Sequence, residues 1–326
     1  MRFIYRFLIR PVVFRLLPEV SHRFAVDSFR LRPVWRLFGL FARSSDGDQR
    51  TVLSGIEVRN PVGIAAGFDK DCEVLGSLLD IGFGYVVGGT VTLDARQGTP
   101  KPRMIRRSKE GALINALGFP GRGLAPARKQ LARLSPVVSA RTLISISGTE
   151  EDSIRECLVA LEPLVAGVEV NISSPNTAGL AVFQEPVRLR QLIEMLSAAK
   201  SKPLFVKMPR LTDSGAFIEL IQAAHEGGAD GFVTANTLPI AHQGLAVGKG
   251  GLSGKPLLES TLELVEQARK HLGDGPTVIG CGGISNAEDA RAVMDAGADA
   301  VQLYTALVFE GPGIASSISR GLRATR

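Results

Sequence analysis

Asn171-Ile-Ser-Ser-Pro-Asn-Thr-Ala-Gly-Leu180 is a cluster of polar residues that directly follows an apolar, β-branched run, Val168-Glu-Val170. The run indicates a buried strand, and the proline in the cluster stops its hydrogen-bond ladder. Hydrogen-bonding side chains at the end of a buried strand are costly unless each has a partner, so their clustering indicates a binding site for a small polar molecule. An ordinary polar turn is the alternative interpretation, because asparagine, serine and proline are common turn residues.

The same pattern recurs along the chain. Apolar runs end in polar residues or glycine eight times, at 60–67, 85–90, 143–147, 168–171, 203–207, 231–236, 277–283 and 300–305. Apolar residues at helical spacing occupy some of the intervals, at 189–199, 217–224 and 287–296, the last ending at Gly297. Eight alternating strands and helices predict a (β/α)8 TIM barrel with its active site at the C-terminal ends of the strands. Periodicity alone also permits an open doubly wound sheet, but eight units is the number that closes a barrel.

The composition fits one catalytic domain plus an attached segment. A chain of 326 residues that is 45% hydrophobic can bury a large core without disulfides. Its three cysteines, Cys72, Cys157 and Cys281, match no zinc or disulfide spacing, which favours a reducing compartment. The four histidines are scattered as well, so we expect no bound metal.

The excess positive charge lies in the first 43 residues. This leader has nine arginines against one glutamate and one aspartate, whereas the remaining 283 residues have a net charge of −1. Arg2, Arg6 and Arg10 recur at every fourth position and predict one basic helical face, with apolar residues such as Phe3 and Phe7 on the others. Such a segment suits the surface of an anionic membrane, while its regular arginines exclude a transmembrane span and a signal peptide.

This charge distribution predicts that the chain has two units, an amphipathic helical segment at 1–43 and a catalytic barrel at 44–326. The alternative for the leader is a cap over the bottom of the barrel with solvated arginines. We expect no nucleic-acid partner, because no basic, aromatic-interleaved groove continues into the barrel.

Glycines and lysines at strand ends predict a site for a phosphorylated ligand. Cys281-Gly-Gly-Ile284 and Tyr304-Thr-Ala306 follow the seventh and eighth strands, where barrels of this kind bind phosphate through backbone N–H groups and a helix N-terminus. Gly251-Leu-Ser-Gly254 adds a third close backbone approach. Lys70 follows the first strand and Lys207 ends the fifth, which places two cations at the barrel mouth; apolar flanks argue against solvent-facing loop residues.

Several motifs considered together are more specific than any one of them. They are Asn60-Pro-Val-Gly-Ile-Ala-Ala-Gly-Phe-Asp-Lys70, Lys101-Pro-Arg-Met-Ile-Arg106, Leu113-Ile-Asn-Ala-Leu-Gly-Phe119, the Asn171 to Leu180 cluster, Gly250-Gly-Leu-Ser-Gly254 and Gly280-Cys-Gly-Gly283. This set resembles the flavin-dependent dihydroorotate dehydrogenases, and specifically their membrane-associated, quinone-dependent class, which has serine where the soluble class has cysteine. The leader motif Leu17-Pro-Glu-Val-Ser-His-Arg-Phe24 is similar to the helical cap of that class.

The resemblance implies an FMN cofactor over the barrel mouth. Its phosphate would be bound by Gly282, Gly283, Tyr304 and Thr305, and the rest of the flavin would lie near Ala66, Gly67, Thr90, Ser145, Asn171, Lys207, Ala235 and Gly254. The pyrimidine substrate would be bound by Lys70, Asn115, Phe119, Asn171, Asn176, Asn236 and Thr237. Amides that donate and accept, together with one cation, suit a cyclic amide with a carboxylate. Ser174 would be the catalytic base, and His22 and Arg106 would line a passage for the quinone.

The implied function is oxidation of (S)-dihydroorotate to orotate with a membrane quinone as the electron acceptor, in de novo pyrimidine (UMP) biosynthesis. The implied protein is a monomer attached peripherally to a membrane, at the cytoplasmic face of the inner membrane if it is bacterial. The chain departs from the family pattern at five places: Cys72, Pro120-Gly121, Ser145, Ala181 and Ala235. Two other functions therefore stay open: a related flavoenzyme that oxidises another cyclic amide, and a non-redox isomerase or lyase with Lys70 or Lys207 as the acid–base group.

Overall fold

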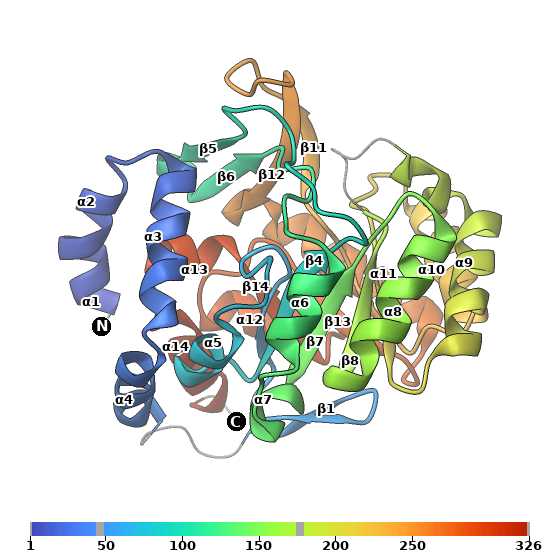
Figure 1. Cartoon of the computed structure of the whole chain (residues 1–326), viewed down its shortest axis with the longest axis horizontal. Coiled ribbons are helices and arrows are strands. Elements are labelled where there is room, and N and C mark those ends of the chain that lie inside the picture. Colours follow the sequence, from blue (N-terminus) through green and yellow to red (C-terminus); the bar gives the residue numbers. More distant parts are fainter. Residues whose placement is uncertain (1, 44–48, 174–178, 325–326) are drawn as a thin grey trace.

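Eight parallel strands close into a barrel in the computed structural model, which describes residues 2–43, 49–173 and 179–324 (Figure 1). The strand order is β10-β13-β14-β3-β4-β7-β8-β9, and β10 pairs with β9 to complete the circle. The strands are β3 (Val62–Ile64), β4 (Tyr85–Val91), β7 (Thr142–Ile146), β8 (Gly167–Asn171), β9 (Leu204–Lys207), β10 (Gly231–Val233), β13 (Thr277–Cys281) and β14 (Ala300–Leu303). The predicted barrel is confirmed, and closure excludes the open sheet.

Helices surround the barrel, and the main core lies between the two layers. They are α5 (Leu75–Asp80), α6 (Leu124–Leu131), α7 (Pro136–Ser139), α8 (Glu151–Leu161), α9 (Pro186–Ala199), α10 (Ser214–Glu226), α11 (Leu258–Leu272), α12 (Ala287–Asp295), α13 (Thr305–Glu310) and α14 (Ile314–Arg323). The three predicted helices correspond to α9, α10 and α12. The first two begin three residues early, because Pro186 suits a first helical turn and the Asp213 side chain caps α10 by accepting from Ala216 N at 3.0 Å.

A hairpin covers the bottom of the barrel. Its strands, β1 (Thr51–Leu53) and β2 (Ile56–Val58), place Leu53, Ile56 and Val58 against inward-facing side chains of the barrel strands. The hairpin turn is fixed by Ser54, whose Oγ donates to the carbonyl of Asp230 at 2.7 Å, just before β10 begins. The alternative in which the leader caps the bottom is therefore wrong.

A four-stranded antiparallel sheet lies over the opposite end, at the top of Figure 1, and was not predicted. It has the order β11-β12-β6-β5 and is assembled from two long insertions, which follow β4 and β10. Its strands are β5 (Met104–Arg107), β6 (Ala112–Asn115), β11 (Leu238–Ala241) and β12 (Lys249–Gly254). This sheet brings Asn115 and Gly254 to the barrel mouth.

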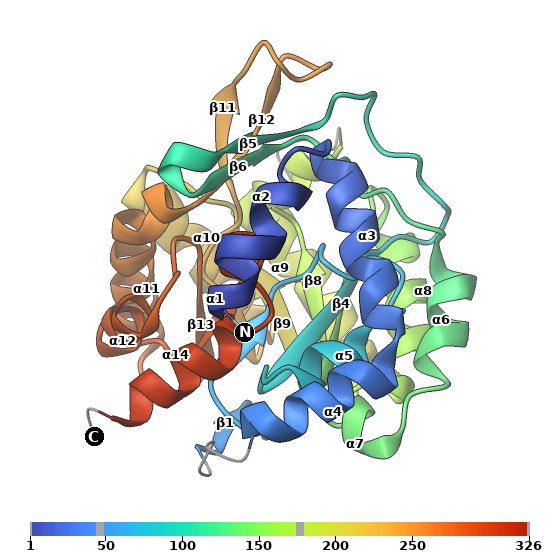
Figure 2. The same ribbon diagram turned by 90° about the vertical axis from the view of Figure 1, so that its left-hand side faces the viewer.

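The leader forms helical segments along one side of the barrel (Figure 2). They are α1 (Arg2–Ile4), a π-helical turn (Tyr5–Ile9), α2 (Arg10–Val13), α3 (Pro18–Arg30) and α4 (Arg32–Arg43). The predicted basic face exists, but it faces the barrel: Arg2 lies 2.7 Å and Arg6 3.7 Å from the carboxylate of Glu310, and Arg10 donates to the carbonyl of Phe309 at 2.9 Å. Phe29 of α3 is buried in the main core, so the leader is also part of the packed structure.

Because Arg2, Arg6 and Arg10 face the barrel, most large apolar side chains of residues 2–13 face outward, and further apolar side chains are exposed along α3 and α4. Phe3 is 71% exposed, and the other large exposed apolar residues of the leader are Ile4, Phe7, Leu8, Ile9, Val12, Leu16, Leu17, Val20, Phe24, Leu31, Val34 and Leu37. In residues 2–13 this arrangement reverses that of an ordinary surface helix, whose apolar face is buried against the protein. Within the described residues, no helix is both long enough and apolar enough to cross a membrane.

Candidate active site

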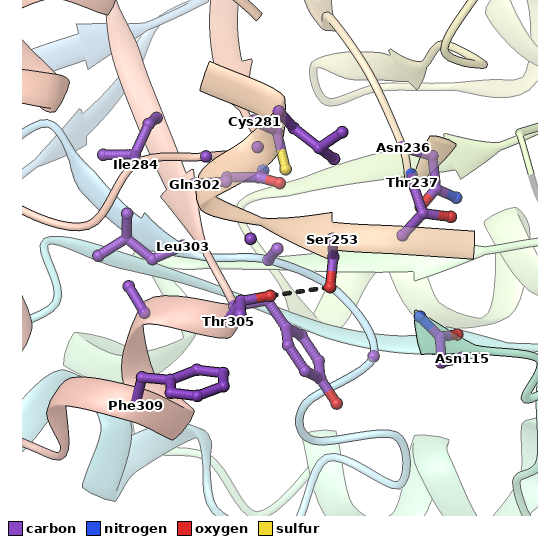
Figure 3. A pocket seen from close by; sticks show the side chains of 18 of the residues that line it. Asn115, Asn236, Thr237, Ser253, Cys281, Ile284, Gln302, Leu303, Thr305 and Phe309 are labelled. Atoms are coloured by element: carbon purple, nitrogen blue, oxygen red, sulfur yellow. Dashed lines mark hydrogen bonds between the residues drawn. The ribbon is translucent and has the colours of Figure 1, made fainter. Parts of the chain in front are cut away.

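A cavity of about 400 Å³ lies at the C-terminal ends of the barrel strands. In Figure 3 the polar side chains of Asn115, Asn236 and Thr237 gather at one side of it and the apolar side chains of Ile284, Leu303 and Phe309 at the other. Fifteen of the predicted site residues line the cavity: Ala66, Gly67, Lys70, Thr90, Asn115, Phe119, Asn171, Lys207, Asn236, Thr237, Gly254, Gly282, Gly283, Tyr304 and Thr305.

A chain of hydrogen bonds fixes the amide side chains at one side of the cavity. Asn171 Nδ2 donates to Thr90 Oγ1 at 3.2 Å, and Asn171 Oδ1 accepts from Ser173 Oγ at 2.7 Å. Asn236 Nδ2 donates to the same Ser173 hydroxyl at 3.0 Å, and Ser145 Oγ lies 3.0 Å from Thr90 Oγ1 at the other end of the chain. Four barrel strands or their loops thus hold the two asparagines in one orientation, which prepares them for a planar polar ligand.

Two lysines place positive charge beside these amides. Lys207 is 4% exposed, and although burial acts to lower its pKa, the neighbouring Cys281 and Glu169 raise the pKa overall. Among the described residues, none accepts a hydrogen bond from Lys207 Nζ at the cavity wall. Lys70 Nζ donates to the carbonyl of Gly67 at 2.6 Å, and burial, followed by the charge of Arg103, lowers the pKa of Lys70 to about 8. Lys207 is therefore a cation at neutral pH, and Lys70 is mainly a cation.

Three glycines form a close backbone cradle at another part of the cavity. Gly254, Gly282 and Gly283 have φ of +102°, +120° and +82°, a region that favours glycine. A Cβ on Gly283 would overlap the backbone of Leu258, the first residue of the 15-residue helix α11. Nearby, Ser253 Oγ and Thr305 Oγ1 lie 2.9 Å apart (Figure 3). Backbone N–H groups, hydroxyls and a helix N-terminus are the donors that bind a phosphate group.

Two of the predicted cofactor-binding residues, Ser145 and Ala235, do not line the cavity. Ser145 is buried behind Thr90, and Ala235 packs in the core between the barrel and its helices. The departures from the family pattern at these two positions therefore change the support of the site rather than its surface. Ser174 and Asn176 lie outside the described residues.

The two residues predicted to line a quinone passage do not line one common cavity. His22 lines a second cavity of about 610 Å³, between α3 and the loops that follow β3 and β4. Arg106 lines neither cavity. Instead its guanidinium donates to the carbonyl of Leu16 at 2.7 Å and to Ser21 Oγ at 2.6 Å, and it stacks 4.7 Å from the ring centroid of Phe14. Arg106 therefore fixes the turn between α2 and α3.

Aromatic rings connect the two cavities. The ring of Phe68 lies 5.1 Å from that of His22 and 6.0 Å from that of Tyr304, which lines the main cavity. Burial, together with the charge of Lys70, lowers the pKa of His22 to about 3, so its imidazole is neutral at physiological pH. Lys70 lines both cavities.

Sequence analysis missed Arg210, which lies in the loop after β9. It is 6% exposed and donates hydrogen bonds to the carbonyls of Asn236 and Cys281, each at 3.0 Å. The signal that singled out Lys70 and Lys207, a basic residue shortly after a barrel strand, also applies to Arg210.

Comparison with known proteins gives one consistent family. The family model described as dihydroorotate dehydrogenase matches residues 49–325. A protein of Leifsonia xyli named dihydroorotate dehydrogenase (quinone) is 38% identical and covers 99% of both chains, and one of Agrobacterium fabrum with the same name is 39% identical over 84% of this chain and 80% of its own. A crystal structure of DHODH from Eimeria tenella in complex with ferulenol has a TM-score of 0.81 and 27% identity, and the match covers 96% of this chain and 94% of that one.

Proposed function

This chain belongs to the dihydroorotate dehydrogenase family, in its quinone-dependent class, and from that premise we propose that it uses FMN to oxidise (S)-dihydroorotate to orotate and reduces a membrane quinone. This reaction belongs to de novo pyrimidine biosynthesis. One observation carries the proposal. A single cavity combines a glycine cradle suited to phosphate with fixed amides and two lysines suited to a cyclic amide that has a carboxylate group.

The residues of the cavity suit FMN. The phosphate group would be bound by Gly282, Gly283, Tyr304 and Thr305. Glycine is required at position 283 because a Cβ there would overlap the backbone of Leu258. Ala66, Gly67, Thr90, Asn171 and Gly254 would surround the rest of the flavin, with Ser145 and Ala235 behind them. Lys207, a buried cation, would stabilise negative charge on the flavin ring. When bound, FMN supplies the two-electron acceptor for the substrate's hydride.

The substrate would lie between the flavin and the amide network. Lys70 would pair with the carboxylate of dihydroorotate, because a carboxylate in this partly closed site needs a cation. Asn115, Asn171, Asn176, Asn236 and Thr237 would hydrogen-bond the ring, and Phe119 would cover it. Such amides distinguish the carbonyl oxygens of the ring from its N–H groups.

Ser174 would take the proton from C5 while the hydride leaves C6. Serine is a weak base at neutral pH and usually needs a neighbouring base to activate it. Among the described residues, the hydrogen-bond network of Asn171 and Asn236 contains no histidine or carboxylate that could do so. A water relay past Thr177 and Phe119 would therefore carry the proton away.

The second half-reaction would use the leader as a membrane contact. His22 and Arg106 would border the route of the quinone, and Tyr304, linked to His22 through Phe68, would lie between that route and the flavin. The exposed apolar side chains of 1–43 favour contact with a lipid surface, and 44–326 would hold the catalytic residues. The protein would act as a monomer at the membrane, on the cytoplasmic face of the inner membrane if it is bacterial.

Anaerobic addition of dihydroorotate tests the chemistry. We expect purified protein to be yellow and to lose its blue absorption when dihydroorotate is added without oxygen, with recovery on addition of quinone. A colourless protein would contradict the flavin assignment. A yellow protein that dihydroorotate fails to bleach would indicate a related flavoenzyme with another cyclic amide as its substrate.

Replacing Phe3, Phe7 and Leu8 together by serine should weaken binding to lipid vesicles. These side chains are 71%, 60% and 65% exposed, so their removal should leave the fold intact. Each contributes apolar area that leaves water on membrane contact, so we expect the vesicle partition coefficient to fall by roughly tenfold or more. Bleaching by dihydroorotate should be unchanged, whereas turnover with a long-chain quinone should fall.

The matched control is Val137→Ser, which removes an equally exposed apolar side chain, 65% exposed, from α7 outside the leader. Cosedimentation with lipid vesicles measures the binding of both variants and of the parental protein. Equal binding of the triple variant and the parental protein would rule out the apolar leader surface as the membrane contact.

A further inference from the structure

The guanidinium of Arg210 is buried at the junction of three loops. Besides the carbonyls of Asn236 and Cys281, it contacts the beginning of helix α11: Nη1 donates to Ser260 Oγ at 2.7 Å and Nη2 to Thr261 Oγ1 at 3.0 Å. These four bonds connect the loops after β9 and β10 and the end of β13 to the helix whose first residue faces Gly283. Arg210 thus lies directly behind the glycine cradle.

This positive charge lacks a counter-ion within the described part of the chain. All four of its hydrogen-bond acceptors are neutral carbonyls or hydroxyls. Burial lowers the pKa of Arg210 to about 10, with Cys281 acting in the opposite direction, so the side chain remains cationic at neutral pH. A buried ion without an opposite charge is costly, and proteins keep such ions where a ligand supplies the missing charge.

The geometry directs this charge toward the cradle. Arg210 Nη2 donates to the carbonyl of Cys281, and that carbonyl shares a peptide unit with the N–H of Gly282. Donation to the carbonyl of a peptide polarises the unit and makes its N–H a stronger donor. A Cβ on Gly282 would lie 2.5 Å from Arg210 Nη2, so glycine at this position is also what lets the guanidinium approach the loop.

The second carbonyl acceptor connects the charge to the amide side of the cavity. Arg210 Nε donates to the carbonyl of Asn236, and the side chain of Asn236 accepts from Thr237 N at 2.8 Å and donates to Ser173. One buried cation therefore fixes both the cradle and one of the proposed pyrimidine-binding asparagines.

We propose that Arg210 is a cofactor-positioning residue that supplies the positive charge for the phosphate monoester of FMN and makes the protein prefer FMN to riboflavin. This inference rests on the proposed function, because it takes the glycine cradle as the site of the flavin phosphate. The preference follows because riboflavin has the same ring system and ribityl chain but no charge at the position that Arg210 stabilises.

The test compares the two flavins on the full-length chain. Protein stripped of its bound flavin is titrated with FMN and with riboflavin, and the quenching of flavin fluorescence gives both dissociation constants. Arg210→Gln should weaken FMN binding by roughly tenfold or more, because a hydrogen-bonded charge is lost, while riboflavin binding changes by less than about threefold. Arg210→Lys keeps the charge but not the planar fork, so it should retain most of the preference for FMN.

The matched control is Arg291→Gln, which removes an arginine of α12 that also donates to backbone carbonyls, including Leu322 O at 2.6 Å. It should leave both dissociation constants unchanged. Equal weakening of FMN and riboflavin in Arg210→Gln would show that Arg210 is only a structural brace, and loss of the preference in Arg210→Lys as severe as in Arg210→Gln would show that charge is not the cause. Either result would overturn the inference about Arg210 and leave the proposed function standing. A parental protein that binds neither flavin would overturn both.

Discussion

Ser174→Ala should slow the reduction of bound flavin by dihydroorotate by about 10² to 10⁴, the contribution of a positioned general base. Flavin content and melting temperature should match those of the parental protein, because a single hydroxyl is removed. Stopped-flow measurement of flavin bleaching without oxygen isolates this half-reaction from the quinone step. The experiment is informative because Ser174 lies outside the described residues and its role rests on the motif in which it occurs.

The control is Ser197→Ala, which removes an α9 hydroxyl that donates to the carbonyl of Gly228 away from the cavity. It should reduce flavin at the parental rate. The competing base is Lys70, since its pKa of about 8 leaves part of the amine neutral near physiological pH. A Ser174→Ala variant that bleaches at the parental rate, together with a parental rate that rises through pH 8, would assign the proton transfer to Lys70 instead.

Lys70→Ala should weaken the binding of orotate by about thirtyfold to a few thousandfold, because the loss of one partner from a desolvated charge pair costs about 2 to 5 kcal/mol. Titration of the flavin absorption with orotate measures this affinity directly. Lys109→Ala is the matched control, since Lys109 is an exposed lysine that lines the same cavity. It should leave orotate binding unchanged.

The pH dependence of orotate binding provides a second test of Lys70. The charged form binds the carboxylate, and burial lowers the pKa of Lys70 from 10.5 to about 8 in the free site. Affinity should therefore be constant below about pH 8 and fall by about tenfold for each further pH unit, as the proton is lost before binding. The Lys70→Ala variant should lack this dependence. The same pH profile in both proteins would exclude Lys70 as the partner of the carboxylate.

The barrel was predictable because its signals are local. Each strand is a short apolar run, and parallel strands buried on both faces place their polar residues only at the ends. The sheet over the mouth was not predictable in this way. Strands β6 and β12 are far apart in the sequence, and β12 contains three glycines, Gly250, Gly251 and Gly254, so neither its composition nor its neighbours indicate a strand.

The site was predictable to the extent that it follows strand ends and motifs. Asn171 and Lys207 end barrel strands, Lys70 and Gly283 lie in the loops that follow two others, and all four line one cavity. Which way a side chain faces was not predictable: Ala235 turns into the core although Asn236 lines the cavity. The leader shows the same limit, because periodicity predicts a basic face but only packing against Glu310 decides that this face points inward.

The ion pairs of the leader also affect whether purified protein retains its bound cofactor during storage. Glu310 is 8% exposed, lines the main cavity, and is neutralised by Arg2 and Arg6. Proteolytic clipping after Arg6 or Arg10 would leave this carboxylate facing the cavity without its cations, where it would repel an anionic cofactor. A preparation with a trimmed N-terminus should therefore fade from yellow on standing, and intact mass is the property to check before its colour is interpreted.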